Sequence, residues 1–415
     1  MSANYVIIGC GAAGVAAAES IRERDENCKI TMYNGEPFPF YFRPALSYFM
    51  KGLISEEKLY AKPVYWAQAR GIRALHEKVA SVRPVDREVA GDSGMVTSYD
   101  KLLIATGAWP VTLDCPGANL PGVFTYRSIM CCRKITGYIQ KRAVTEAVVV
   151  GGGILGVELA ENFMSLGLKV TMLVRGSRLL DSRFDAQMAQ IIQRKMEADG
   201  ATFVFGAQLA EVASESGHTS AVITDGGQRI SSGIVGVAVG VRPMGKFLTG
   251  SGIDWENGIA VDSWQRTSMD GVFAAGDVAQ VKGAHGSPGG WLTASLQGAR
   301  AGYCMAGGEE DARPVTYLNA SHVYKMRYAL VGRFSAPEEG AIRKVRLTMS
   351  GEDEYGLLTL ENGRIVGGAF LGGADLAWDV ARAVENRVRV GQAQTTLDVG
   401  TLRHLANSGA PAALF

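Results

Sequence analysis

Two short glycine-rich stretches with the same spacing are the residues of this chain best suited to holding a ligand. "GCGAAG" contains Gly9, Gly11 and Gly14, and "GGGILG" contains Gly151, Gly153 and Gly156. In a GxGxxG turn the first glycine permits a tight bend, the second admits a pyrophosphate close to the backbone, and the third allows close helix–strand packing. Two such turns predict two dinucleotides in one chain. The predicted contacts are Gly9, Gly11, Ala12, Ala13, Gly14, Gly151, Gly153, Ile154, Leu155 and Gly156.

Residues about twenty positions after each turn predict how the two nucleotides are recognised. An acid there binds ribose hydroxyls, and Glu36 fits this role after the first turn, with Asn34 as the fallback. After the second turn the strand ends in "MLVRGSR", with Val174 where an NAD-selective acid is expected. Arg175 and Arg178 either bind the 2′-phosphate of NADP or are solvated loop charges beside NAD. The sequence does not choose between NAD and NADP.

Local patterns around the two turns predict an α/β fold. Residues 4–9 and 147–153 are apolar runs that end in glycine, and each is followed by a helical pattern and a second strand. Further strands end in small residues at 99–110, 233–243 and 271–279. From about residue 321 the texture becomes β-rich, with a hairpin around Asn362–Gly363 and then a helix.

These elements predict two Rossmann-type domains and a C-terminal α+β domain. We expect a first, discontinuous dinucleotide-binding domain at 1–112 and 253–320, a second at 113–252, and a third domain at 321–415.

Composition excludes several other classes of protein. The 415 residues carry 42 basic and 41 acidic side chains, a formal net charge of +1, which gives no reason to expect nucleic acid as a partner. The chain has no apolar run long enough to span a membrane and no leader pattern, so we expect a cytoplasmic protein. None of the six cysteines forms a CxxC motif or spaced ligand cluster, so no metal site is expected. The role of the adjacent Cys131 and Cys132 stays open.

The ordered motifs of residues 4–320 resemble the FAD-dependent pyridine nucleotide oxidoreductases of the rubredoxin reductase and nitrite reductase flavodomain type. The resemblance rests on "GCGAAG", "EPFPFYFRPALS", "LLIATGAWP", "GGGILGVE", "GVAVGVRP" and "FAAGDVA". It implies that the first turn and the domain 1–112 and 253–320 bind FAD, and that the second turn and the domain 113–252 bind NAD(P). It also implies that 321–415 is a dimerisation or interface domain.

The resemblance also implies individual roles. Asp277, after Gly276, matches the aspartate that bonds the ribityl chain of FAD, and Arg43–Pro44 match the pair that borders the flavin ring. Residues Ala105, Thr106 and Gly107 match a turn near the phosphates of FAD, Val79 a backbone contact to adenine, and Gly240 belongs to the matching nucleotide-domain motif. Glu158 matches a glutamate near the nicotinamide–flavin junction and is the candidate catalytic residue; its alternative is an ordinary polar helix residue.

Two departures from related enzymes bear on the chemistry. Residues 43–50 read "RPALSYFM", so the cysteine that disulfide reductases and NADH peroxidases carry in this region is absent. Tyr48 stands where related ferredoxin reductases often have lysine. We therefore expect an FAD-containing NAD(P)H:acceptor oxidoreductase that exchanges electrons with a rubredoxin, a ferredoxin or an iron–sulfur subunit.

Other interpretations stay open. One version makes the chain the NAD(P)-reactive flavoprotein subunit of a larger complex, and the sequence does not decide between that and a homodimer. The alternatives are a flavin-binding signalling or assembly protein, and a direct reductase of a quinone or oxygen.

Overall fold

The computed structural model describes residues 2–282, 289–309, 315–335, 338–351 and 353–408. Contacts between residues divide the chain into two compact units. The first comprises Met1–Phe42, Tyr60–Trp109 and Arg242–Asn319, and the second Arg43–Leu59, Pro110–Val241 and Ala320–Phe415. The division into three domains stays a prediction.

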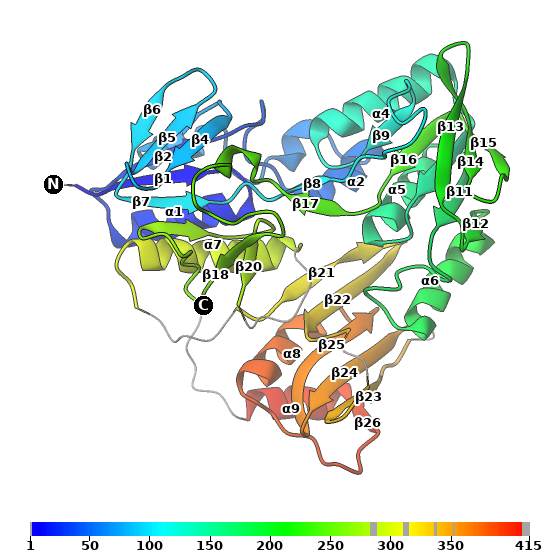
Figure 1. Ribbon diagram of the computed structural model, residues 1–415. Coiled ribbons are helices and arrows are strands. Elements are labelled where there is room, and N and C mark those ends of the chain that lie inside the picture. Colours follow the sequence, from blue (N-terminus) through cyan, green and yellow to red (C-terminus); the bar gives the residue numbers. More distant parts are fainter. Residues whose placement is uncertain (1, 283–288, 310–314, 336–337, 352, 409–415) are drawn as a thin grey trace. The chain divides into compact units, whose positions relative to one another are not determined.

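A five-stranded parallel sheet forms the centre of the first unit (Figure 1). Its order is β3 (Ile72–Leu75), β2 (Lys29–Tyr33), β1 (Asn4–Ile8), β7 (Lys101–Ile104) and β19 (Val272–Ala274). Side chains alternate between the two faces, so Val6 and Ile8 enter one apolar core while Tyr5 and Ile7 enter the other. Both faces of the sheet are therefore buried, as is usual for parallel sheets.

Helices α1 (Ala12–Arg24) and α7 (Trp291–Met305) pack side by side in this unit. A Cβ atom at Gly298 or Gly302 of α7 would lie only 2.0 or 2.4 Å from the carbonyl oxygens of Ala13 and Ala17. Glycine is thus required for the backbones to approach this closely. The remaining elements are an antiparallel sheet of β4 (Val79–Arg83), β5 (Glu88–Gly91) and β6 (Val96–Ser98), the parallel pair β18 (Ile259–Val261) and β20 (Ala279–Val281), α3 (Trp66–Ala69) and η3 (Lys246–Leu248).

The second unit repeats this parallel arrangement. Its sheet has the order β12 (Thr202–Phe205), β11 (Lys169–Val174), β10 (Glu146–Val150), β16 (Ile234–Val237) and β9 (Val123–Thr125). In both sheets the strand before the glycine turn is central, and the strand order reverses beside it. The associated elements are η1 (Arg43–Ala45), α2 (Leu46–Met50), η2 (Glu56–Leu59), α4 (Ile129–Arg142), α5 (Ile154–Ser165), α6 (Ala186–Ala198), and the antiparallel sheet of β13 (Leu209–Glu215), β14 (His218–Thr224) and β15 (Arg229–Ser231).

The C-terminal part of the second unit is β-rich, as predicted. Its six-stranded sheet has the order β21 (Leu318–Val323), β22 (Met326–Gly332), β25 (Arg364–Leu371), β24 (Tyr355–Glu361), β23 (Ile342–Thr348) and β26 (Thr396–Asp398), followed in chain order by α9 (Val399–Asn407), with α8 (Leu376–Glu385) after β25. The predicted hairpin turn is confirmed, because Asn362 and Gly363 both have positive φ between paired β24 and β25.

The pair β8 (Ala108–Pro110) and β17 (Val241–Pro243) forms a further small sheet.

No helix within the described residues is long and apolar enough to cross a membrane.

Candidate functional site

The first glycine turn has the geometry that a pyrophosphate requires. Gly9 has φ +116°, and a Cβ atom there would lie 2.3 Å from the carbonyl oxygen of Ala105, just after β7. A Cβ at Gly14 would lie 1.9 Å from the carbonyl oxygen of Gly9, whereas a Cβ at Gly11 would meet no protein atom within 4 Å. Gly9 and Gly14 are therefore needed for packing, and Gly11 keeps open the space where a phosphate would lie.

The second turn reproduces this division of roles. Gly151 has φ +117°, and a Cβ there would lie 2.3 Å from the carbonyl oxygen of Ala238, just after β16. A Cβ at Gly156 would lie 2.1 Å from the carbonyl oxygen of Gly151, and one at Gly153 would again meet nothing. Ile154 and Leu155 lie in the first turn of α5 and are partly exposed. Each turn thus lies where the strand order reverses, the usual place for a nucleotide in an open α/β sheet.

The helices that begin at these turns are suited to bind anions. α1 and α5 begin after Gly11 and Gly153, and neither has a side-chain cap or an acidic residue in its first turn. By contrast, α4 and α6 are capped by Ser128 and Asp185. The N–H groups at the start of α1 and α5 are left for a ligand, and the helix dipole favours a negative one. The residues present therefore fit the pyrophosphates of FAD and NAD(P)H.

Other predicted FAD residues gather around the first turn. Gly276 follows β19 with φ +78°, and a Cβ there would lie 3.2 Å from Cβ of Ala13. Its N–H donates to Oε1 of Gln297 at 2.8 Å, and the adjacent Asp277 is half-buried. The turn Ala105–Thr106–Gly107 follows β7, and the Thr106 hydroxyl donates to the carbonyl oxygen of Met244 at 2.7 Å.

In the loop after β2, Glu36 is more accessible to a ribose than Asn34, the alternative residue. Asn34 is buried and is used within the loop, where its amide nitrogen donates to the Phe38 carbonyl oxygen at 2.8 Å and its oxygen accepts from the Glu36 N–H. Glu36 is half-buried and accepts a hydrogen bond from the Tyr41 hydroxyl at 2.7 Å. Val79 is the first residue of β4. It lies beside this loop, as shown by the residue before it: a Cβ at Gly35 would lie 3.2 Å from the Lys78 side chain.

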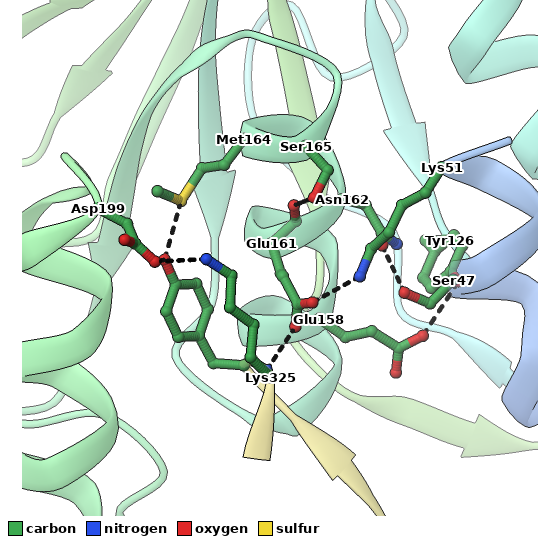
Figure 2. Close-up of polar contacts among 11 residues, drawn as sticks. Ser47, Lys51, Tyr126, Glu158, Glu161, Asn162, Met164, Ser165, Asp199 and Lys325 are labelled. Carbon is green, nitrogen blue, oxygen red and sulfur yellow. Dashed lines mark hydrogen bonds and ion pairs between the residues drawn. The ribbon is translucent and has the colours of Figure 1, made fainter. Parts of the chain in front are cut away.

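In the second unit, Glu158 contacts Tyr126 (Figure 2), and the residue after Tyr126 contacts Arg43. Glu158 lies on α5 and accepts a hydrogen bond from the Tyr126 hydroxyl at 3.1 Å. The next residue, Arg127, accepts a hydrogen bond at its carbonyl oxygen from the Arg43 guanidinium at 3.3 Å. Arg43 and Pro44 begin η1, which directly precedes α2. Arg43 and Pro44 thus belong to the same compact unit as Glu158, and the first glycine turn belongs to the other.

Glu158 is poised to gain or lose a proton near neutral pH. Burial of its carboxyl group raises its pKa to about 7, with the negative charge of Glu161 acting in the same direction. The Tyr126 hydrogen bond and the positive charge of Lys51 act in the opposite direction. No ion pair of Glu158 itself is found among the described residues. Glu158 is therefore protonated below about pH 7 and ionised above it.

The two arginines after β11 have different surroundings. Arg178 donates to the carbonyl oxygens of Phe184 and Asp181 and pairs with the Asp181 carboxylate at 2.5 Å. Arg175 is exposed, and Val174 before it is buried. Arg178 thus stabilises its own loop, which leaves Arg175 as the more accessible cation. Gly240, also exposed, has φ +122° in the turn after β16.

The cysteines form no disulfide in the structure. Cys131 and Cys132 lie in the first turn of α4, and Cys132 is buried with its thiol 3.9 Å from the Leu46 carbonyl oxygen. Burial raises the pKa of Cys132 to about 12, so its thiolate is strongly disfavoured. Within the described ranges no group of three or more His, Cys, Asp or Glu side chains is arranged to hold a metal ion.

Sequence reasoning missed three residues beside Glu158. Tyr126 and Lys51 lie 32 and 107 positions before it, with no local pattern that links them. Glu161 had a usable signal, because residues three apart on a helix share a face.

Comparison with known proteins agrees with this geometry. Residues 3–298 match the family described as pyridine nucleotide-disulphide oxidoreductase. The rubredoxin-NAD(+) reductase of Pseudomonas putida is 29% identical over 276 residues, which cover 66% of this chain and 71% of that protein. The NADH-dependent phenylglyoxylate dehydrogenase subunit epsilon of Aromatoleum evansii is 28% identical over 360 residues, which cover 81% of each.

Among solved structures, a ferredoxin reductase from Rhodopseudomonas palustris has a TM-score of 0.87 with 23% identity and covers 99% of this chain and 100% of its own. This likeness confirms the predicted fold of two Rossmann-type domains. The family match confirms the resemblance that the motifs indicated. The chain belongs to the pyridine nucleotide-disulphide oxidoreductase family and is an FAD-dependent NAD(P)H oxidoreductase.

Proposed function

We propose that this enzyme exchanges electrons between NAD(P)H and a one-electron iron–sulfur carrier, without a redox-active disulfide. The observation that carries the proposal is the segment 43–50, which has no cysteine and borders α5 through the contact of Ser47 with Asn162. A disulfide mechanism needs a reactive thiolate there. The thiol that contacts this segment, Cys132, is buried with a raised pKa.

The name of one relative fits this class of acceptor, whereas other relatives are named for the reduction of persulfides or sulfur. One relative is a reductase named for rubredoxin, and another is a subunit of an NADH-dependent dehydrogenase. The second relative supports the version in which this chain is the NAD(P)-reactive subunit of a larger complex.

Several predicted residues have defined roles in this proposal. The N-terminus of α1 binds the pyrophosphate of FAD, while Glu36 and Val79 bind its adenosine part and Asp277 its ribityl chain. Arg43 and Pro44 border the flavin ring, and the N-terminus of α5 binds the nicotinamide nucleotide. Glu158 holds a proton or a negative charge beside the reacting rings, where an ionised carboxylate would stabilise the positive charge that develops on nicotinamide. Bound FAD supplies the chemistry that divides a hydride's two electrons into single transfers.

Anaerobic stopped-flow spectroscopy of the holoenzyme tests this proposal. NADH or NADPH should bleach the flavin, and rubredoxin or a ferredoxin should then reoxidise it with two carriers reduced per nucleotide. Prior alkylation with iodoacetamide should leave both steps unchanged. Fast reduction of a disulfide or persulfide that alkylation abolishes would instead establish a thiol mechanism. Faster reoxidation by a quinone or oxygen than by either carrier would favour a direct reductase of small acceptors.

Arg175 provides a test of nucleotide preference. We propose that its exposed guanidinium binds the 2′-phosphate of NADPH, so Arg175→Ala should raise KM for NADPH about tenfold, equivalent to about 1.4 kcal/mol, and leave KM for NADH unchanged. Arg194→Ala, which removes an exposed arginine of α6, is the matched control for lost positive charge. Equal changes for both nucleotides, or none for NADPH, would exclude this role.

A further inference from the structure

Glu161 joins three separate segments of the second unit (Figure 2). It lies on α5, three residues after Glu158. Its Oε1 accepts a hydrogen bond from Nζ of Lys51 at 2.5 Å, and both side chains are only 13% exposed. Its Oε2 accepts from the backbone N–H of Lys325 at 3.3 Å. Each oxygen of one carboxylate therefore holds a different segment against α5.

The first of these segments is α2, which follows the predicted flavin-bordering pair Arg43–Pro44. Lys51 is the C-cap residue of α2. The Ser47 hydroxyl of the same helix donates to Oδ1 of Asn162 at 2.6 Å, and both residues are buried. Successive residues of α5, Glu161 and Asn162, thus hold α2 at two points. Lys51 brings a positive charge from the end of α2 to α5, whereas Tyr48 stands where related ferredoxin reductases often have lysine.

The second segment is the turn between β21 and β22. Tyr324 and Lys325 have φ values of 43° and 61°, a left-handed conformation that costs non-glycine residues on the order of 1 kcal/mol each. The turn is held by two bonds to Oδ2 of Asp199, from the Tyr324 hydroxyl at 2.6 Å and from Nζ of Lys325 at 2.7 Å. Glu161 adds the bond to the turn's backbone, so this conformation is fixed from both α5 and the end of α6.

Groups from four segments of the chain act on Glu158. Tyr126, which follows β9, donates a hydrogen bond to it, and buried Cys132 of α4 interacts with it. The charges of Lys51 and Glu161 act in opposite directions. Lys51 favours the ionised form of Glu158, while Glu161 favours the protonated form. Lys51 pairs with Glu161, so these two opposing charges act on Glu158 together, after the larger effects of burial and the Tyr126 hydrogen bond.

We propose that Glu161 and Lys51 are positioning residues for the hydride-transfer site, which together hold α2 against α5 and set the charge beside Glu158. Neither residue needs to contact a substrate for this role. The inference rests on the proposed function only where it places Glu158 beside the reacting rings.

Two charge-removing variants test the inference because they shift the Glu158 titration in opposite directions. Glu161→Gln removes a negative charge and should lower the titration midpoint of Glu158 by about one pH unit, whereas Lys51→Met removes a positive charge and should raise it by about the same amount. The double variant should return close to the wild-type midpoint. A role that is only structural would make both single variants behave alike, since each breaks the same ion pair.

The titration is read directly from the holoenzyme by carboxyl ¹³C NMR with labelled glutamate, and Glu158→Gln identifies the signal. The pH dependence of anaerobic flavin bleaching by NAD(P)H gives a second readout and should move with the NMR midpoint. Glu361→Gln breaks the Arg333–Glu361 pair, which is 2.6 Å long and involves β24, and should change neither readout. Shifts in the same direction for both single variants, or no shift, would overturn the inference. If NAD(P)H failed to bleach the flavin of the wild-type enzyme, that result would instead count against the proposed function. The NMR titration would still test the inference.

Discussion

Gly11→Ala should yield a folded protein that has lost most of its flavin. A Cβ at position 11 meets no protein atom within 4 Å, and the backbone there is extended, with φ −96° and ψ −168°, so alanine introduces no strain. The new methyl group instead occupies space that the FAD phosphates need beside the N–H groups of α1. We expect the FAD dissociation constant to rise at least about 100-fold, equivalent to about 2.7 kcal/mol. The flavin-to-protein absorbance ratio and fluorescence titration of the apoprotein measure this change.

Gly14→Ala is the matched variant that separates loss of ligand from loss of fold. Its Cβ would lie 1.9 Å from the carbonyl oxygen of Gly9, a backbone atom that cannot move without opening the turn. Circular dichroism of the apoproteins should therefore show a lower melting temperature for Gly14→Ala than for the wild type. The melting temperature of apo Gly11→Ala should be close to that of the apo wild type. Normal flavin content in Gly11→Ala would show that FAD phosphates do not lie against this turn.

Gly153→Ala should retain flavin but lose its reduction by nicotinamide nucleotides. Gly153 repeats the geometry of Gly11, with an extended backbone, φ −82° and ψ −179°, and no protein atom near its Cβ position. We expect a rise of at least about 100-fold in the NAD(P)H concentration that gives half-maximal bleaching. Dithionite should still bleach the flavin fully, because it needs no nucleotide site.

The variants at positions 11 and 153 also control for each other. If the first turn holds FAD and the second holds NAD(P)H, Gly11→Ala should affect flavin content and Gly153→Ala only reduction by NAD(P)H. Loss of flavin from Gly153→Ala with full retention in Gly11→Ala would reverse the assignment of the two nucleotides. Gly156→Ala, whose Cβ would lie 2.1 Å from the Gly151 carbonyl oxygen, is the folding control for the second turn.

The sequence by itself determined the features that depend on short stretches of chain. Both glycine turns were predictable because strand, turn and helix follow one another within about 25 residues and each glycine has a steric reason. The Asn362–Gly363 hairpin was predictable for the same reason, since its left-handed backbone favours those two residue types. The family was recognisable from the order of such motifs.

Only the tertiary structure decided which side chains surround Glu158. Lys51 and Glu161 are 110 positions apart, and Ser47 and Asn162 are 115 apart, so no periodicity connects them. The sequence did not distinguish the two arginines after β11 as partners of a 2′-phosphate. In the structure the loop carbonyls bind Arg178 and leave Arg175 exposed. The proton affinity of Glu158 follows from burial and from charges on other elements, and these become defined only when distant segments pack together.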